Sequence, residues 1–140
     1  MSKLLLIVAV LGLLVSGYLL LSYQRTDAML CFSGHGCDDV RASNFSSILG
    51  VPTPLFGVAY YFGLGVLAAL WTPQEAGRFK WSLIVVTAIG LAVSAVLTYL
   101  EAFVIKAWCS WCLTSASLSA IAFLLVWFRL STKDSYENNK

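Results

Sequence analysis

Four long stretches without a charged residue constrain this chain more than any other feature. They cover residues 4–24, 42–74, 81–100 and 107–128. The hydrocarbon core of a bilayer, about 30 Å thick, requires about 20 apolar residues of α-helix, and each stretch can supply that length. The chain is 59% hydrophobic and 11% charged, whereas soluble domains carry roughly 25% charged residues. The pattern predicts an all-α membrane protein.

The stretches define the expected domain, one transmembrane unit of residues 1–140. We expect a four-transmembrane-helix bundle with spans at about 4–22, 55–71, 81–100 and 107–128. The first span is longer than the 7–15 apolar residues of a signal peptide and lacks a small-residue cleavage site. It is therefore expected to be retained as a helix.

The polar segments between and after the spans hold most of the charged residues. Residues 23–54 form the first connector, in which an Asp pair at 38–39 and a glycine at 50 resemble helix start and stop signals. We expect a short extra helix near 39–49, lying over the membrane surface. The tail at 129–140 is polar and expected to be frayed.

Lysine and arginine counts predict the orientation, because cytoplasmic loops carry the excess of basic residues. With four spans, one side holds six basic residues and the other holds three: Lys3, Arg78, Lys80, Arg129, Lys133 and Lys140 against Arg25, Arg41 and Lys106. Both termini and the tail 129–140 are therefore expected in the cytoplasm, and 23–54 outside. The net charge of only +2 gives no basis for nucleic-acid binding.

Four cysteines form two close pairs, and the predicted topology places both pairs on the non-cytoplasmic side. Cys31 and Cys37 lie in the outside connector, and Cys109-Ser-Trp-Cys112 begins the last span. Residues three apart share a helix face, and a helix N-terminus favours the thiolate. This placement favours thiol–disulfide exchange.

Two other interpretations of the cysteines stay open at this point. They could form inert structural disulfides in a non-catalytic membrane protein, or bind zinc together with His35. For His35 alone, a solvated loop histidine is the expected role.

The residues around the cysteines resemble the vitamin K epoxide reductase family, in its compact bacterial-type form. The similarity rests on Cys31-x5-Cys37-Asp38, Ser43, ILGVP at 48–52, FG at 56–57, a Tyr pair at 60–61, and Cys109-Ser-Trp-Cys112. It implies a helix bundle that encloses a quinone, of the ubiquinone or menaquinone type, beneath the loop cysteines. The implied activity couples disulfide formation outside the membrane to quinone reduction within it.

The resemblance also implies roles for individual residues. Cys31 would exchange with a separate thioredoxin-like (DsbA-like) thiol oxidase, since the chain holds no fused domain of that kind. Cys37 would pass electrons to Cys109 through a transient disulfide, and Cys112 would act on the quinone. Metal plays no part in this scheme. Three residues are expected to line the quinone site: Ser43, Phe56 and Tyr60.

Two departures bear on the substrate. Ala116 and Thr53 stand where animal members carry a tyrosine and an asparagine, which argues against the alternative of a vitamin K epoxide reductase. Four hydroxyls could donate to a quinone oxygen, those of Ser43, Thr53, Tyr60 and Tyr61. Because the predicted spans hold no charged residue, protons are expected to enter near the outer face.

Overall fold

Long helices make up most of the chain, in agreement with the apolar stretches. The computed structural model describes residues 2–25, 31, 36–48, 50–70 and 76–137. In chain order these form α1 (Ser2–Tyr23), α2 (Gly36–Ala42), β1 (Ser47–Ile48), β2 (Val51–Pro52), α3 (Thr53–Ala69), α4 (Ala76–Tyr99), the π-helix η2 (Leu100–Ile105) and α5 (Ser110–Glu137). The described chain is therefore mostly helical.

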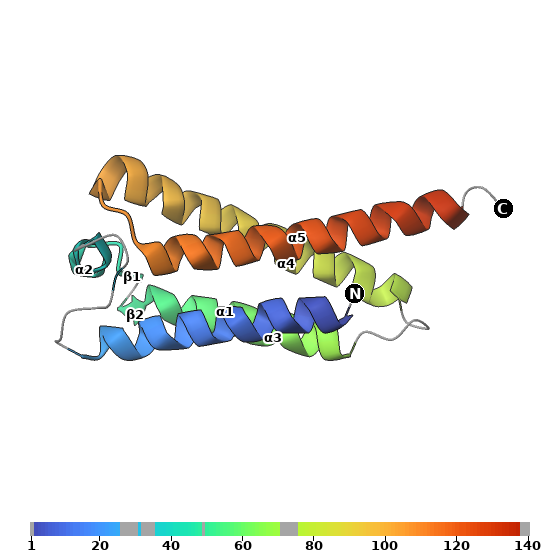
Figure 1. The fold of residues 1–140 in the computed structure, drawn as a ribbon, viewed down its shortest axis with the longest axis horizontal. Helices are drawn as coiled ribbons and strands as arrows, with labels where there is room; N and C mark the ends of the chain where they lie inside the picture. The colour runs from blue at the N-terminus through green and yellow to red at the C-terminus, as the bar shows by residue number, and fades with distance from the viewer. Residues whose placement is uncertain (1, 26–30, 32–35, 49, 71–75, 138–140) are drawn as a thin grey trace.

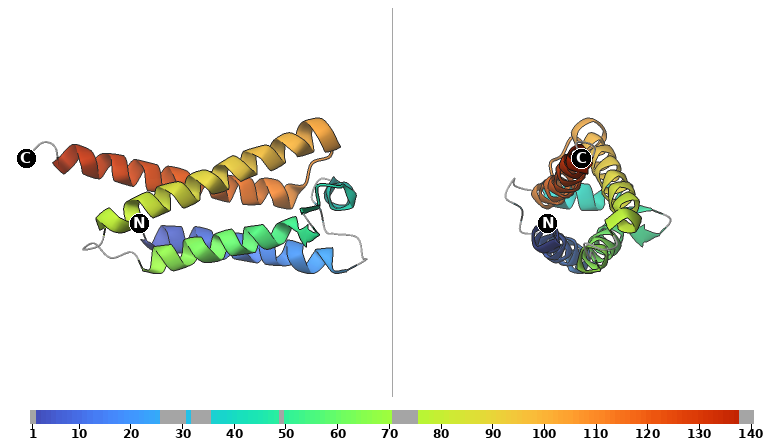
Figure 2. Two further views of the ribbon diagram at one scale, coloured as in Figure 1. Left: turned by 180° about the vertical axis from the view of Figure 1, so that it is seen from behind. Right: turned by 90° about the vertical axis from the view of Figure 1, so that its right-hand side faces the viewer.

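The four long helices pack as two pairs. Figure 1 shows α1 lying along α3, and α4 crossing α5. Seen end-on in Figure 2, the pairs close a ring in which α1 also contacts α5 and α3 contacts α4. The short elements α2, β1 and β2 cover one end of this ring, where α1 ends and α3 begins (Figure 1). We call this the redox end, and the other the closed end.

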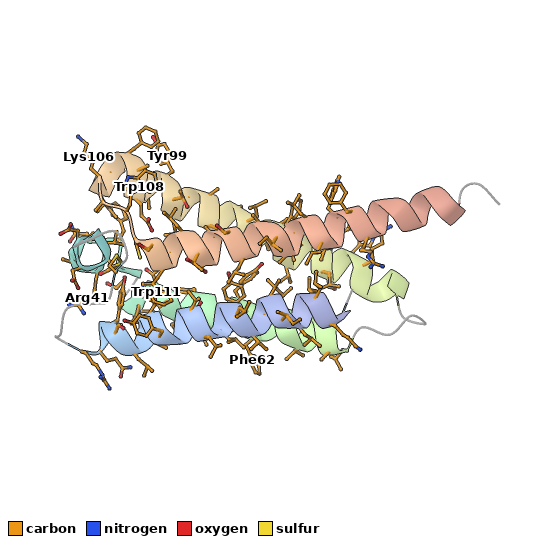
Figure 3. The ribbon with its side chains drawn as sticks, viewed as in Figure 1. Arg41, Phe62, Tyr99, Lys106, Trp108 and Trp111 are labelled. Carbon is orange, nitrogen blue, oxygen red and sulfur yellow. A yellow bond between two sulfur atoms is a disulfide. The ribbon has the colours of Figure 1, made fainter. Side chains whose placement is uncertain are left out.

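The outer surface of the helices is apolar. Leu14, Phe62 and Trp81 have exposed fractions of 65%, 62% and 70%, and Phe62 points away from the bundle in Figure 3. In water such a surface would drive aggregation, whereas lipid solvates it. Three helical segments are long and apolar enough to cross a membrane, Lys3–Tyr23, Lys80–Ile105 and Ser110–Arg129, and Thr53–Ala69 is a shorter apolar helix. The chain is a membrane protein.

A dense apolar core fills the closed end. Its fully buried members come from all four long helices and include Leu5, Leu64, Leu83 and Val126. Small residues let the helices approach: a Cβ on Gly12 of α1 would overlap the Tyr61 ring of α3.

The connector helix is shorter and earlier than the predicted 39–49. It occupies Gly36–Ala42 and includes Cys37. It ends there because Ser43 folds back, its hydroxyl donating to the Val40 carbonyl at 2.7 Å, a local bond that competes with the helix. The chain then forms the β1–β2 ribbon, which turns at Gly50 with φ of +81°. The proposed Gly50 stop signal therefore marks a turn between strands.

Four other predicted boundaries also differ. Residues 101–106, expected as a connector, continue α4 as η2 because no Gly or Pro interrupts them; the helix stops at Lys106, whose φ is 56°. The last helix begins at Ser110 rather than 107. It also extends through the expected frayed tail to Glu137, because residues 129–137 contain no helix breaker. The second helix begins at Thr53 instead of 55, with Pro54 in its first turn.

Candidate functional site

The loop cysteines form a disulfide at the redox end. Cys31 and Cys37 are joined by a bond of 2.02 Å, and the Cys31 sulfur lies 3.7 Å from the Ser110 hydroxyl of α5. Arg41 holds α2 in place by donating to the Ser22 carbonyl in the last turn of α1 at 3.0 Å and to the Arg25 carbonyl just beyond that helix at 3.1 Å. A cation is favourable there because the C-terminal end of a helix carries a partial negative charge on its last carbonyl groups. The disulfide is thereby held against the start of α5.

Close backbone contact brings the second cysteine pair to the first. A Cβ on Gly36 would overlap the carbonyl oxygen of Trp108, so only glycine permits this approach. Gly36 and Trp108 each precede a cysteine, and those cysteines, Cys37 and Cys109, belong to one buried cluster that Cys31 and Cys112 border. In Figure 3, Trp108 lies on the segment between η2 and α5, at the same end of the bundle as α2. The four cysteines, which the sequence analysis placed on the same side of the membrane, therefore lie together at one end of the bundle.

Cys109 and Cys112 are free thiols at the N-terminus of α5. The Cys112 backbone N–H donates to the Cys109 sulfur at 3.3 Å, so the sulfur caps the helix. The adjacent Cys112 thiol lowers the pKa of Cys109 most, and N–H groups of the first turn lower it further, while burial and the Glu101 charge oppose them only in part. This thiol has the electrostatic surroundings of a reactive cysteine.

A buried acid that the sequence analysis did not select lies beside these thiols. Glu101 of η2 is only 3% exposed, and its carboxylate accepts the Cys109 backbone N–H at 3.2 Å. The carboxylate and the sulfurs of Cys109 and Cys112 lie within 4.8 Å of one another. The prediction placed Glu101 in the connector between the third and fourth spans and gave it no role. Its position as an isolated acid in the apolar run LEAFVI was the available signal.

A cavity of about 440 Å³ opens between the helices below the cysteines. Its wall is mostly apolar and includes Cys112 and Glu101, but Cys109 is absent from it. All three residues predicted to line a quinone site are on this wall: Ser43, Phe56 and Tyr60. Thr53 and Ala116, the two departures from the animal enzymes, line it as well. Substrate-sized pockets have this volume and apolar character.

The four hydroxyls that were candidates to donate to a quinone oxygen differ in whether they already have a hydrogen-bond partner. Those of Ser43, Thr53 and Tyr61 already donate to backbone carbonyls, of Val40, Phe45 and Ser115 respectively. The Tyr60 hydroxyl is buried and, in the described part of the chain, has no hydrogen-bond partner. A buried polar group without a partner is unfavourable. An apolar ring with carbonyl acceptors, as in a quinone, fits both the wall and this donor.

The zinc alternative finds little support at the described positions. Cys31 and Cys37 are in a disulfide and offer no thiolate, and His35 lies outside the described residues. Glu101, Cys109 and Cys112 converge, but three donors are one fewer than a structural zinc site uses.

A comparison with known families agrees with this arrangement. The family model described as "Vitamin K epoxide reductase family" matches residues 3–127. The match includes all four cysteines, the cavity wall and Glu101.

Proposed function

The chain belongs to the vitamin K epoxide reductase family, whose members are membrane oxidoreductases, and from that premise we propose that it oxidises an exported thioredoxin-like protein at the expense of a membrane quinone. One observation carries the proposal. An oxidised pair, Cys31–Cys37, and a reduced pair, Cys109 and Cys112, meet at one end of the bundle. The reduced pair in turn borders a cavity suited to a quinone.

The proposed topology has four spans. To the three long apolar helices it adds α3, whose 17 residues are at the lower limit of spanning length and suit a locally thinned bilayer. Both termini are cytoplasmic by the six-to-three distribution of basic residues. All four cysteines then face the non-cytoplasmic side, where disulfides persist.

Electrons enter through the loop pair. A partner thiolate attacks Cys31, breaks the Cys31–Cys37 bond and releases Cys37; the partner's second thiol then frees Cys31 and leaves the partner oxidised. Cys37 attacks Cys109 of the oxidised inner pair and displaces Cys112. Cys31 then attacks Cys37 and displaces Cys109, which leaves the outer pair oxidised and the inner pair reduced.

The surroundings of the two inner thiols, Cys109 and Cys112, suit them to different steps of this reaction. Cys109 is the group displaced in the last step, and its lowered pKa makes it a good leaving group. Cys112 lines the cavity, where a bound quinone supplies the two-electron acceptor for the dithiol. Tyr60 can donate its free hydroxyl to a carbonyl oxygen there.

The test is quinone reduction by the purified chain with a reduced thioredoxin-like protein. We expect turnover with ubiquinone or menaquinone, and loss of turnover in Cys112→Ala. Ser117→Ala is the matched control, because this exposed hydroxyl of α5 only bonds the Leu113 carbonyl. Undiminished turnover in Cys112→Ala would refute the assigned role.

Trapped disulfides separate this proposal from a non-catalytic membrane protein. In Cys112→Ser the inner disulfide cannot form, so the Cys109 thiolate attacks Cys37 of the outer disulfide and releases Cys31, and we expect mass spectrometry to detect the resulting Cys37–Cys109 linkage. Cysteines acting only as structural staples would give the 31–37 linkage alone. Offering vitamin K epoxide in place of the quinone tests the narrower alternative activity.

A further inference from the structure

The buried carboxyl group of Glu101 has no part in the reaction as described so far. It lies deep at the redox end, where an ionised carboxylate without a cation is costly. Its carboxyl group accepts the Cys109 N–H and lies beside the Cys112 thiol, which satisfies only part of its acceptor capacity. A buried acid at a reactive centre is a candidate for proton transfer.

The backbone around Glu101 is irregular in a way that directs it toward the thiols. It belongs to the π-helix η2, and the chain reverses at Lys106 in a left-handed conformation. The Lys106 and Ala107 N–H groups both donate to the Glu101 carbonyl, which fixes the reversal. Single π-helical turns often occur at functional sites. Without this turn, α4 would continue outward and Glu101 would lose its contact with Cys109.

The groups that face Glu101 come from two other elements. From α5 and the residue before it come Cys112 and Cys109, and the Tyr23 hydroxyl of α1 interacts with the carboxyl only electrostatically. Arg41, the basic side chain of α2, is engaged by Asp38 and by carbonyls at and just beyond the end of α1. Of these groups, the two thiols lie within 4.8 Å of the carboxyl, so they and the cavity that Glu101 also lines are its proton partners.

We propose that Glu101 is the catalytic acid and base for Cys112; this rests on the function proposed above. When the Cys37 thiolate attacks Cys109, the Cys109–Cys112 bond breaks and the electron pair stays on Cys112. The protonated Glu101 carboxyl gives its proton to that sulfur, so no bare thiolate faces the apolar cavity. When the Cys109–Cys112 bond forms again and two electrons leave the dithiol, Glu101 takes the Cys112 proton back.

Cys109 and Cys112 thus need different stabilisation when each is displaced from a disulfide. Cys109 leaves as a thiolate, because the helix N-terminus and the neighbouring thiol stabilise its charge. Cys112 is three residues further along α5 and borders the cavity, so it needs a proton from a neighbouring group. Glu101 is the acid that lies within 4.8 Å of its sulfur.

The first experiment needs no quinone. The inner pair of a Cys31→Ser, Cys37→Ser chain is cycled between dithiol and disulfide with dithiothreitol and diamide, and infrared difference spectra are recorded. We expect a protonated carboxyl band in the oxidised state, because Glu101 then holds the Cys112 proton. The band should be absent in Glu101→Gln. Its absence in the parent chain, or its persistence in Glu101→Gln, would overturn the proposal.

The second experiment separates proton transfer from positioning. Glutamine keeps an oxygen that can accept the Cys109 N–H but cannot carry a proton. Glu101→Gln should slow quinone reduction about 100-fold or more and remove the pH dependence contributed by the carboxyl, while Glu101→Asp restores part of the rate. Asp39→Asn, an exposed acid on α2, is the control for loss of a charge.

The outcomes distinguish this proposal from the function on which it depends. Unchanged turnover and an unchanged pH profile in Glu101→Gln would make Glu101 a helix cap only and refute the proposal. Failure of the unmodified chain to reduce any quinone would refute the proposed function, and the infrared measurement would still decide whether Glu101 exchanges a proton with the inner pair.

Discussion

The two ends of the bundle are built from the same four helices but packed in opposite ways. At the closed end, residues such as Leu64 and Leu83 are fully buried and fill the space between helices. At the redox end the helices surround a cavity, and the buried residues include Cys37, Cys109 and Glu101. The buried apolar core at the dense end stabilises the packing of all four helices. The redox end is therefore free to keep a void, an unpartnered hydroxyl and a buried acid, each of which lowers stability.

The largest expected effect is on stability at the closed end. Leu64→Ala should lower the free energy of unfolding by about 2–5 kcal/mol, because it leaves a void in a packed core. The same substitution at Leu14, which is 65% exposed, is the matched control and should have a small effect. Thermal unfolding in detergent measures both. An equally small effect at Leu64 would show that this end does not carry the stability.

A contact at the redox end should give the next largest effect. Gly36→Ala places a methyl group on the Trp108 carbonyl, so α2 must move away, at a cost of about 1–3 kcal/mol. The exchange between the two cysteine pairs should slow, as followed by trapping of the Cys37–Cys109 linkage. Gly63→Ala, where a Cβ meets no atom within 4 Å, is the control. Normal trapping in Gly36→Ala would mean that the close approach is not needed for exchange.

Two adjacent tyrosines of α3 allow the same comparison between a hydroxyl used in packing and a hydroxyl left free at the cavity. Tyr61 donates to the Ser115 carbonyl and contacts the hydroxyls of Ser115 and Ser119, so Tyr61→Phe should cost about 1 kcal/mol of stability. Tyr60→Phe should leave stability unchanged but raise the KM for quinone about three- to tenfold, the loss of one hydrogen bond. The reverse result would place the quinone donor elsewhere.

The smallest predicted effect concerns pH. Because the pKa of Cys109 is lowered in the folded state, its thiolate should react with a maleimide at a lower pH than an ordinary thiol. Cys112→Ala should move that midpoint upward, since the Cys112 thiol is the main cause of the shift. The ionised form is the stabilised one, so its contribution to stability is present above the unfolded pKa and lost as pH falls through the folded pKa. A midpoint unaffected by Cys112→Ala would contradict this.

Several features of the site followed from residue types and their spacing. Charge-free stretches predicted the long helices, because lipid admits only apolar segments whose backbone groups pair internally. The motifs of the resemblance led to Ser43, Phe56 and Tyr60, all of which line the cavity. Boundaries were predicted less well: the connector helix, the start of α5 and the tail all differ. Each depends on a local bond, such as that of the Ser43 hydroxyl, or on the absence of a helix breaker.

By itself, the sequence determined that the chain enters a membrane and that one of its two cysteine pairs lies at the N-terminus of a helix, where a thiolate is favoured. Both features depend on hydropathy and residue spacing, which are local properties of the chain. Only the tertiary structure decided which hydroxyl is left to donate and which acid faces the thiols. Tyr60 and Tyr61 are neighbours of the same type, and what separates them is the serines of a helix more than fifty residues away. Glu101 meets Cys109 because a π-helical turn and a left-handed residue reverse the chain. Such contacts depend on how elements pack in space, which no local pattern in the sequence specifies.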